Sequence, residues 1–440
     1  GAGVMFVDGK IDGDNLLMMW QMAAACGREH DLLVINPDEP DLSNTYNPLL
    51  HGDPEEVASR AMALTPHSEN NPGTDFYRQS ASGAVRAIVA GLQSANRAYN
   101  PMDIALMLQS DRIFAAVDRM MPNSDAATQF RIWRQKFVAT DRDGNERGLD
   151  MAKMRNELGG LVNKIYTFGS GNFGRVCNSY DPEVVILDAI RQGKIIYCAL
   201  PTLAKREQAG QFGKMLIGDL RSALGHLQKH KQDRPKKPFL CFFDEAGSYL
   251  TEAASAMLEQ ARSCNISLVL AVQTKGNYDN ISPSFRQTAT GNTLTKCWFK
   301  LNEPDTLKWA EEMIGKERQI DYSVSAGKGV GLSHASVSNA KARGQSDSSS
   351  VSYSESTKTE FKVAHYDLMK LGKGECIVQF DGNKVYHVRI PFLSFDKSFQ
   401  AEVGSTFTPN RRRQRRVPGV YAIRIAEEIL DEKAREGGEV

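Results

Sequence analysis

The stretch Pro238-Phe239-Leu240-Cys241-Phe242-Phe243-Asp244-Glu245-Ala246-Gly247-Ser248-Tyr249-Leu250 is an apolar run that ends abruptly in two acids. Its first half has the length and composition of a strand buried on both faces, as in parallel sheets. Ligands bind beside the carboxyl ends of such strands, so Asp244 and Glu245 are expected at the edge of a site. An acid pair there suits ATP hydrolysis, with Asp244 holding Mg²⁺ through water and Glu245 activating the attacking water. The alternative is that the pair caps a following helix.

Charge and cysteine content limit the kinds of site and partner. The chain has 440 residues with 54 basic and 53 acidic side chains, so no global field draws the whole molecule onto nucleic acid or an acidic membrane. The seven cysteines are scattered without CxxC or Cys/His spacing, which fits a reducing environment and predicts no zinc site. No apolar run approaches 18 residues, so no membrane span is expected within these residues.

The beginning of the chain alternates between strand and helix patterns. Residues 4–7 predict a buried strand, 14–26 a helix and 31–36 a second strand, a spacing typical of a βαβ unit. The same alternation returns in the second half. There the pattern predicts helices at 183–192, 204–227 and 253–263, and strands at 194–200, 239–243, 267–273 and 295–301.

A long helical stretch separates these two parts. Residues 74–164 carry helical patterns with no strand between them. We therefore predict an α/β fold, a parallel sheet with helices on both faces, formed by residues 1–73 and 179–396. An all-α domain at 74–178 interrupts it.

The last third of the chain adds three features. Residues 322–359 are rich in Ser and Gly and predict a mobile loop or a long exposed hairpin, and strands are expected at 375–381 and 384–391. A tail at 397–440 carries six residues, Arg411 to Arg416, of which five are arginine, and then an amphipathic helix from Tyr421 to Glu436. The arginines either contact phosphates or anionic lipid heads or form a solvated, disordered junction, and the helix either docks a partner or packs on its own domain.

Three further side chains are candidates for the same site. Arg262 ends a predicted helix and Gln273 closes the strand that follows it, and we expect both near the edge that carries the acids. An amide there senses the γ-phosphate, and an arginine presented to a neighbouring subunit stabilises transition-state charge. The alternatives are a solvated cation at a helix end and an ordinary polar residue at a strand end. Asp8, at the end of the first strand, is the third candidate.

These motifs together resemble the motor domain of type IV secretion coupling proteins, the TraG/TraD class. The resemblance rests on Phe239 to Gln273, with Asp244-Glu245, Gln260-Ala261-Arg262-Ser263 and Ala271-Val272-Gln273, and on the opening Val7-Asp8-Gly9-Lys10. Gly27 to Asn36 and Leu42 to Leu49 are similar to the Dot/Icm-type coupling ATPases in particular. The resemblance implies a RecA-like P-loop ATPase domain bearing an all-α domain, with ATP and Mg²⁺ as cofactors and a hexameric assembly.

The sequence departs from that family in one respect. The motif GxxxxGK[ST], which cradles the phosphates, does not occur. The string Gly169-Ser170-Gly171-Asn172-Phe173-Gly174 is predicted to be a loop instead. We expect the P-loop and the family's membrane anchor upstream of Gly1, and we expect this chain alone to bind ATP poorly and to be inactive. Asp8 and Lys10 match the end of the family's strand after the P-loop.

The function predicted from the resemblance is that of a coupling protein at the cytoplasmic face of the bacterial inner membrane. It would recruit relaxase-DNA complexes, or protein effectors and their adaptors, and deliver them to the components of a type IV secretion channel using ATP. DNA contact and a homo-hexamer are expected for the full-length protein. Two alternatives are a DNA-pumping ATPase of the FtsK or HerA kind and a recruitment platform without hydrolysis of its own.

Overall fold

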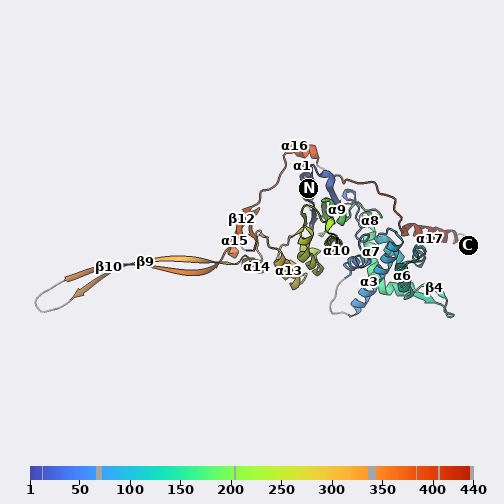
Figure 1. The fold of residues 1–440 in the computed structure, drawn as a ribbon, viewed down its shortest axis with the longest axis horizontal. Coiled ribbons are helices and arrows are strands. Elements are labelled where there is room, and N and C mark those ends of the chain that lie inside the picture. The colour runs from blue at the N-terminus through green and yellow to red at the C-terminus, as the bar shows by residue number, and fades with distance from the viewer. Residues whose placement is uncertain are drawn as a thin grey trace. The chain divides into compact units, whose positions relative to one another are not determined.

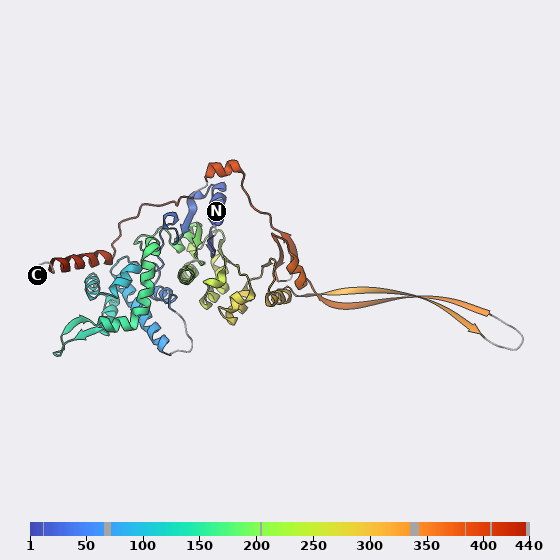
Figure 2. The same cartoon turned by 180° about the vertical axis from the view of Figure 1, so that it is seen from behind.

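The computed structural model describes residues 1–440 except 12, 66–71, 203–204, 335–342, 383, 405–406 and 437–440. The chain forms two compact units. The first comprises Gly1–Asn292 and Ser394–Val440, and the second comprises Thr293–Leu393. The two units are described separately below, and Figures 1 and 2 show their elements from opposite sides.

A five-stranded parallel sheet organises the first unit. Its order is β2-β5-β1-β6-β7, so β1 lies between two neighbours at the centre. All five strands run in the same direction, which brings their carboxyl ends to one edge. The predicted parallel α/β sheet is therefore confirmed. The strands are β1 (Val4–Asp8), β2 (Leu32–Ile35), β5 (Ile195–Ala199), β6 (Phe239–Phe243) and β7 (Ile266–Leu270).

One face of this sheet is covered over β2, β5 and β1. Leu16 and Ala23 of α1 (Gly13–Ala25) pack there in a cluster with strand residues such as Tyr197, and Phe407 from the tail completes it. The same face is open over β6 and β7, where Leu240 and Val269 are each 37% exposed. Parallel strands are normally buried on both faces, so this open area is unusual.

The other helices of the first unit either flank the sheet or form the helical part. Among the described residues, no helix is both long enough and apolar enough to cross a lipid bilayer. The helices are α2 (Pro54–Met62), α3 (Pro72–Ser94), α4 (Pro101–Met107), α5 (Asp111–Asp118), α6 (Asp125–Gln135), α7 (Met151–Gly169), α8 (Gly171–Cys177), α9 (Ile186–Gln192), α10 (Arg206–Lys229), α11 (Ser255–Gln260), α12 (Lys275–Asp279), α13 (Pro283–Asn292), α16 (Lys397–Val403) and α17 (Ala422–Glu436).

Two local predictions for the helical part are wrong. A short antiparallel hairpin, β3 (Val138–Thr140) with β4 (Glu146–Leu149), interrupts the helices where only helical patterns were expected. The string 169–174 is not a loop, because α7 ends at Gly169 and α8 begins at Gly171, with Ser170 alone between them. Gly174 is needed there, since a Cβ at that position would lie 2.5 Å from the carbonyl oxygen of Gly169.

The basic part of the tail is exposed to solvent, but it is tied to the rest of the first unit by hydrogen bonds. Arg412 Nη2 donates to Asp181 Oδ1 at 2.8 Å, and Arg415 Nη2 donates to the same oxygen at 3.0 Å. The Asp181 side chain is only 7% exposed, and its hydrogen bonds with Arg412 hold the pKa of the carboxyl well below its usual value. Arg411 donates to the carbonyl oxygen of Pro40 at 2.9 Å. We call residues 407–421 the strap.

The end of the strap joins the helical part. Ala98 N donates to Pro418 O and Val420 N donates to Ala98 O, at 2.8 and 3.0 Å. The N-terminal turn of α17 is then held by the buried Asp103 of α4, whose Oδ1 accepts from Ala422 N at 2.9 Å. Figure 1 shows α17 beside the helical part, and it contacts α4 and α5. Of the two readings of this helix, packing on its own unit is the one observed.

The second unit is built around an antiparallel sheet of order β12-β11-β8. Residues 295–301 were expected in the parallel sheet, but β8 pairs with β11 instead. A long two-stranded ribbon, β9 with β10, extends from this unit (Figure 2) and agrees with the exposed-hairpin reading of 322–359, although 335–342 lie outside the described residues. The elements are β8 (Lys296–Trp298), α14 (Pro304–Ile314), β9 (Lys316–His334), β10 (Arg343–Phe361), α15 (His365–Lys370), β11 (Glu375–Phe380) and β12 (Lys384–Arg389).

Replacement of Phe407 by alanine tests whether the strap is part of the folded unit. Phe407 is 7% exposed and meets Trp20 edge-on, with ring centroids 5.9 Å apart. Loss of this ring should destabilise the unit by about 3 kcal/mol and accelerate amide exchange in α1 and the strap. Phe392, 88% exposed, provides the matched control, since Phe392→Ala removes a ring of the same size without opening a cavity. Equal effects of the two substitutions would contradict the docking of the strap.

Asp103→Asn tests the buried carboxylate at the start of α17. Burial raises the pKa of Asp103 from 3.8 to about 6. The folded state therefore binds the proton more tightly, and the contribution of this group to stability is present below pH 3.8 and lost as the pH rises through 6. Relative to Asp103→Asn, the wild type should lose about 3 kcal/mol of unfolding free energy between pH 4 and 7. Denaturation curves recorded across this range measure it, and parallel pH profiles for the two proteins would refute it.

Candidate functional site

The two acids lie where the sequence predicted them, at the carboxyl end of β6. Asp244 N still donates to Val7 O of β1 at 2.9 Å, and Ala246 N donates to Ala271 O beyond β7 at 3.0 Å. Between these two anchors Glu245 adopts left-handed backbone angles, φ 50° and ψ 39°. Its side chain makes no capping hydrogen bond to the short 3-10 helix Ala246–Ser248 that follows. The helix-cap alternative therefore has no support in the structure.

Glu245 is held by side chains from two neighbouring strand ends. Lys10 Nζ, which follows β1, lies 2.7 Å from Glu245 Oε1. Gln273 Nε2, which follows β7, donates to the same oxygen at 2.5 Å. The Gln273 backbone is fixed in turn by Asn277, whose Oδ1 accepts from Gln273 N at 3.2 Å. The structure thus brings Glu245 and Gln273 together, as expected from the sequence.

Asp8 lies at the end of β1 and is completely buried. Its Oδ1 accepts from Lys10 N at 2.8 Å and from Ile11 N at 3.1 Å. Its Oδ2 accepts from Tyr197 OH at 2.7 Å and Asn15 Nδ2 at 2.9 Å. With at least two hydrogen bonds on each oxygen, this carboxylate shapes the turn that follows β1.

Asp244 is half-buried beside these groups. Burial and the neighbouring Glu245 carboxylate raise its pKa, while the Lys10 ammonium opposes the shift. Carboxylate oxygens are the ligands that Mg²⁺ prefers, and this ion commonly keeps several waters and takes only one or two protein carboxylates. Asp244 fits such a role. Among the described residues, no group of three or more His, Cys, Asp or Glu side chains is placed to hold a metal ion.

Arg262 does not join this cluster within the chain. It belongs to the short 3-10 helix Ala261–Cys264, which precedes β7, whereas Gln273 follows β7. Since the five-residue strand β7 separates Arg262 from Gln273, Arg262 lies at the amino end of the sheet and Gln273 at its carboxyl end, about 15 Å apart along the strand. The expectation that both lie near one edge is wrong. Arg262 is exposed, so only its predicted role toward a neighbouring subunit is left open.

Several residues of the site were missed or underrated from the sequence. Lys10 was noted only as part of the opening motif, and Asn15, Tyr197 and Asn277 were not considered. These residues are far apart in the sequence, and they come together because β1 lies between β5 and β6 in the sheet. A signal was available in Val7-Asp8-Gly9-Lys10, where a charged pair directly follows a buried strand.

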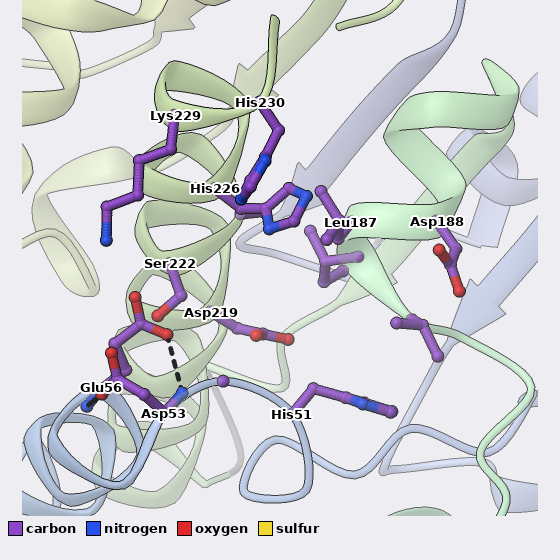
Figure 3. Close-up of a pocket in the computed structure, with 14 residues that line it drawn as sticks. His51, Asp53, Glu56, Leu187, Asp188, Asp219, Ser222, His226, Lys229 and His230 are labelled. Atoms are coloured by element: carbon purple, nitrogen blue, oxygen red, sulfur yellow. Dashed lines mark hydrogen bonds between the residues drawn. The ribbon is translucent and has the colours of Figure 1, made fainter. Parts of the chain in front are cut away.

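A separate pocket of about 410 Å³ lies away from the acid pair (Figure 3). It is bordered by α2, α9 and α10, and the ring of His226 on α10 lies 4.3 Å from the ring of His230, which follows that helix. His226 pairs with Asp233 at 2.8 Å. Deeper in the wall, Asp219 forms a buried ion pair with Arg60. His226 and Asp219 are thus paired with residues beside the pocket, and the pocket does not contain any of the site residues predicted from the sequence.

Comparison with known proteins gives two sequence matches. Residues 238–365 match the family model described as the TraM recognition site of TraD and TraG. The chain is also 23% identical over 347 residues to the type 4 coupling protein DotL of Legionella pneumophila subsp. pneumophila, strain Philadelphia 1. This match covers 69% of the chain and 44% of DotL, so the chain spans less than half the length of that relative.

Solved structures of a coupling protein share the fold. The unbound bacterial conjugative coupling protein TrwBdeltaN70 superimposes with a TM-score of 0.56 at 12% identity, covering 90% of this chain and 79% of that chain. The plasmid coupling protein TrwB in complex with ADP and Mg²⁺ gives the same TM-score and identity, covering 90% and 80%. The central sheet and its helices thus have the RecA-like α/β fold of these structures.

Gly9→Ala tests the close approach between the turn after β1 and the acid pair. A Cβ on Gly9 would lie 2.6 Å from Glu245 Cβ and 2.9 Å from Asp244 O, so one of the two strand ends must move. We expect a loss of about 1–3 kcal/mol in unfolding free energy. Gly13→Ala is the control, because a Cβ there meets no atom within 4 Å. A neutral Gly9→Ala, measured by chemical denaturation, would show that the two strand ends are not in contact.

Proposed function

From its relationship to the type IV secretion coupling proteins, we propose that this chain is the cytoplasmic motor part of such a protein. In this role it couples ATP hydrolysis to the delivery of substrates to a secretion channel. The observation that carries the proposal is the position of Asp244 and Glu245 at the carboxyl end of β6, with Gln273 directly hydrogen-bonded to Glu245.

Each residue of the site has its own role in the proposed hydrolysis of ATP. Asp244 holds Mg²⁺ through water, and Glu245 orients and deprotonates the water that attacks the γ-phosphate. Gln273 senses the γ-phosphate, and Asp8 keeps the turn after β1 in place. When bound, Mg²⁺ supplies positive charge to the phosphate oxygens. The complex of TrwB with ADP and Mg²⁺ supports nucleotide binding in a protein of the same fold.

The phosphate-binding loop is the part that these 440 residues do not provide. Within the described residues, β7 pairs with β6 alone, and the sheet face at Leu240 and Val269 is open. We propose that a strand, P-loop and helix from outside these 440 residues pair with β7 and cover this face. The chain without them binds ATP weakly and does not hydrolyse it.

The assembly and partners follow from the same proposal. The full-length protein forms a homo-hexamer in which the exposed Arg262 faces the nucleotide of a neighbouring subunit. It is anchored in the inner membrane and receives relaxase-DNA complexes, or effectors with their adaptors. The chain has 54 basic and 53 acidic side chains, so its net charge does not attract DNA. Substrates are therefore recognised by local surfaces.

Glu245→Gln tests the proposed catalytic role in a chain that includes the residues encoded before Gly1. Removing the base should lower ATP hydrolysis by about 100-fold or more, while nucleotide binding is retained. Steady-state phosphate release and binding of a fluorescent nucleotide measure the two effects. Glu259→Gln, an exposed glutamate on α11, is the control and should leave both unchanged. Undiminished hydrolysis by Glu245→Gln would remove Glu245 from the mechanism.

A further inference from the structure

We infer that Lys10 is a positioning residue for the Glu245 carboxylate in the ATPase proposed above. Lys10 does not contact the nucleotide in this scheme. Its ammonium fixes the direction in which Glu245 presents its second carboxylate oxygen. The inference rests on the proposed function, and the experiments below separate failure of the one from failure of the other.

The backbone of Lys10 is placed by Asp8. The buried Asp8 carboxylate accepts from Lys10 N at 2.8 Å and from Ile11 N at 3.1 Å, which closes a tight turn directly after β1. Ile11 is forced into left-handed backbone angles, φ 53°, an unfavourable conformation for a β-branched residue. Such strain persists only where the surroundings fix it, and it occurs often at functional sites. The turn directs the Lys10 side chain toward the end of β6.

Glu245 is fixed from both sides through a single oxygen. Its Oε1 receives Lys10 Nζ at 2.7 Å and Gln273 Nε2 at 2.5 Å. Two donors on one oxygen set the plane of the carboxylate and leave Oε2 for another partner. A water that attacks phosphate needs a base in one defined orientation, and an error of about 1 Å in such a group costs on the order of 100-fold in rate.

The acidic side chains at the carboxyl end of the sheet also hold the Lys10 ammonium group in place. Asp8, Asp244 and Glu245 follow adjacent strands, and all three interact with the Lys10 ammonium. The hydrogen bond to Glu245 is the largest cause of the raised pKa of Lys10. Lys10 therefore remains protonated and offsets part of the mutual repulsion of the acids. The 2.7 Å ion pair between Lys10 Nζ and Glu245 Oε1 identifies Glu245 as the partner that Lys10 orients.

A purely structural role predicts a different outcome. The Lys10 side chain is 59% exposed, and an ion pair with one exposed partner contributes no more than about 1 kcal/mol to stability. Loss of the ammonium should therefore leave the fold almost intact. An effect on catalysis without an effect on folding is the expected signature of a positioning residue.

The first experiment uses the 440-residue chain itself and needs no activity. The amine of Lys10 is labelled with a trace of acetic anhydride, and mass spectrometry compares its reactivity with that of the exposed Lys236 in the same sample. Glu245→Gln should raise the reactivity of Lys10 several-fold and leave Lys236 unchanged, because the deprotonated amine becomes more accessible and more populated. Equal reactivity of Lys10 in both proteins would disprove the pairing.

The second experiment uses the longer chain that carries the residues before Gly1. Lys10→Met should lower kcat for ATP hydrolysis by about tenfold to 100-fold with little change in KM, and Lys10→Arg should restore most of the rate. Lys236→Met is the control and should behave like the wild type. A kcat that is unchanged, or that rises because Lys10 restrains Glu245, would overturn the inference. Absence of hydrolysis in the wild type would instead contradict the proposed function, while the labelling result still tests the pairing.

Discussion

The parallel pairing of β1 with β5 on one side and β6 on the other is the constraint on which the site depends. It brings the carboxyl ends of strands that are far apart in the sequence to one edge. Lys10 follows β1 and Glu245 follows β6, so they meet only because these strands are paired, and the pairing of β6 with β7 brings Gln273 to the same place. The carboxylates of Asp8, Asp244 and Glu245 are thereby brought close together, and the ammonium group of Lys10 offsets part of their negative charge. The order of the strands therefore determines both the positions of these side chains and the charges around them.

A second organising feature is the strap, which ties the α/β part to the helical part of the first unit. Phe407 enters the core beside the sheet, Arg412 pairs with the nearly buried Asp181, and Ala422 is bound by Asp103 of α4. The polar contacts are specific because buried carboxylates are costly without partners. The arginine cluster that suggested a phosphate clamp is thus partly used within the molecule.

The sequence predicted the elements of the sheet well because continuous apolar runs are a strong local signal. Val4–Asp8 and Phe239–Phe243 are such runs, and the acids after β6 could be assigned to an edge from strand direction alone. The position of Arg262 was also available in principle, since a residue before a strand and a residue after it must lie at opposite edges. The strap could not be predicted: Asp181 and Arg412 are 231 positions apart, and exposed charge and buried charge look alike in a sequence.

The strap also has a mechanical meaning. Its contacts follow one another along the chain, from α17 and Asp103 to Val420, then the arginines, and finally Phe407. Tension applied at the C-terminal end of α17 would therefore break these contacts one after another, before any strand of the parallel sheet carried load. Contacts in series yield at low force, whereas parallel strands sheared along their length resist together. Under such tension the tail of the first unit would therefore detach while Asp244, Glu245 and Gln273 stay together at the ends of their strands.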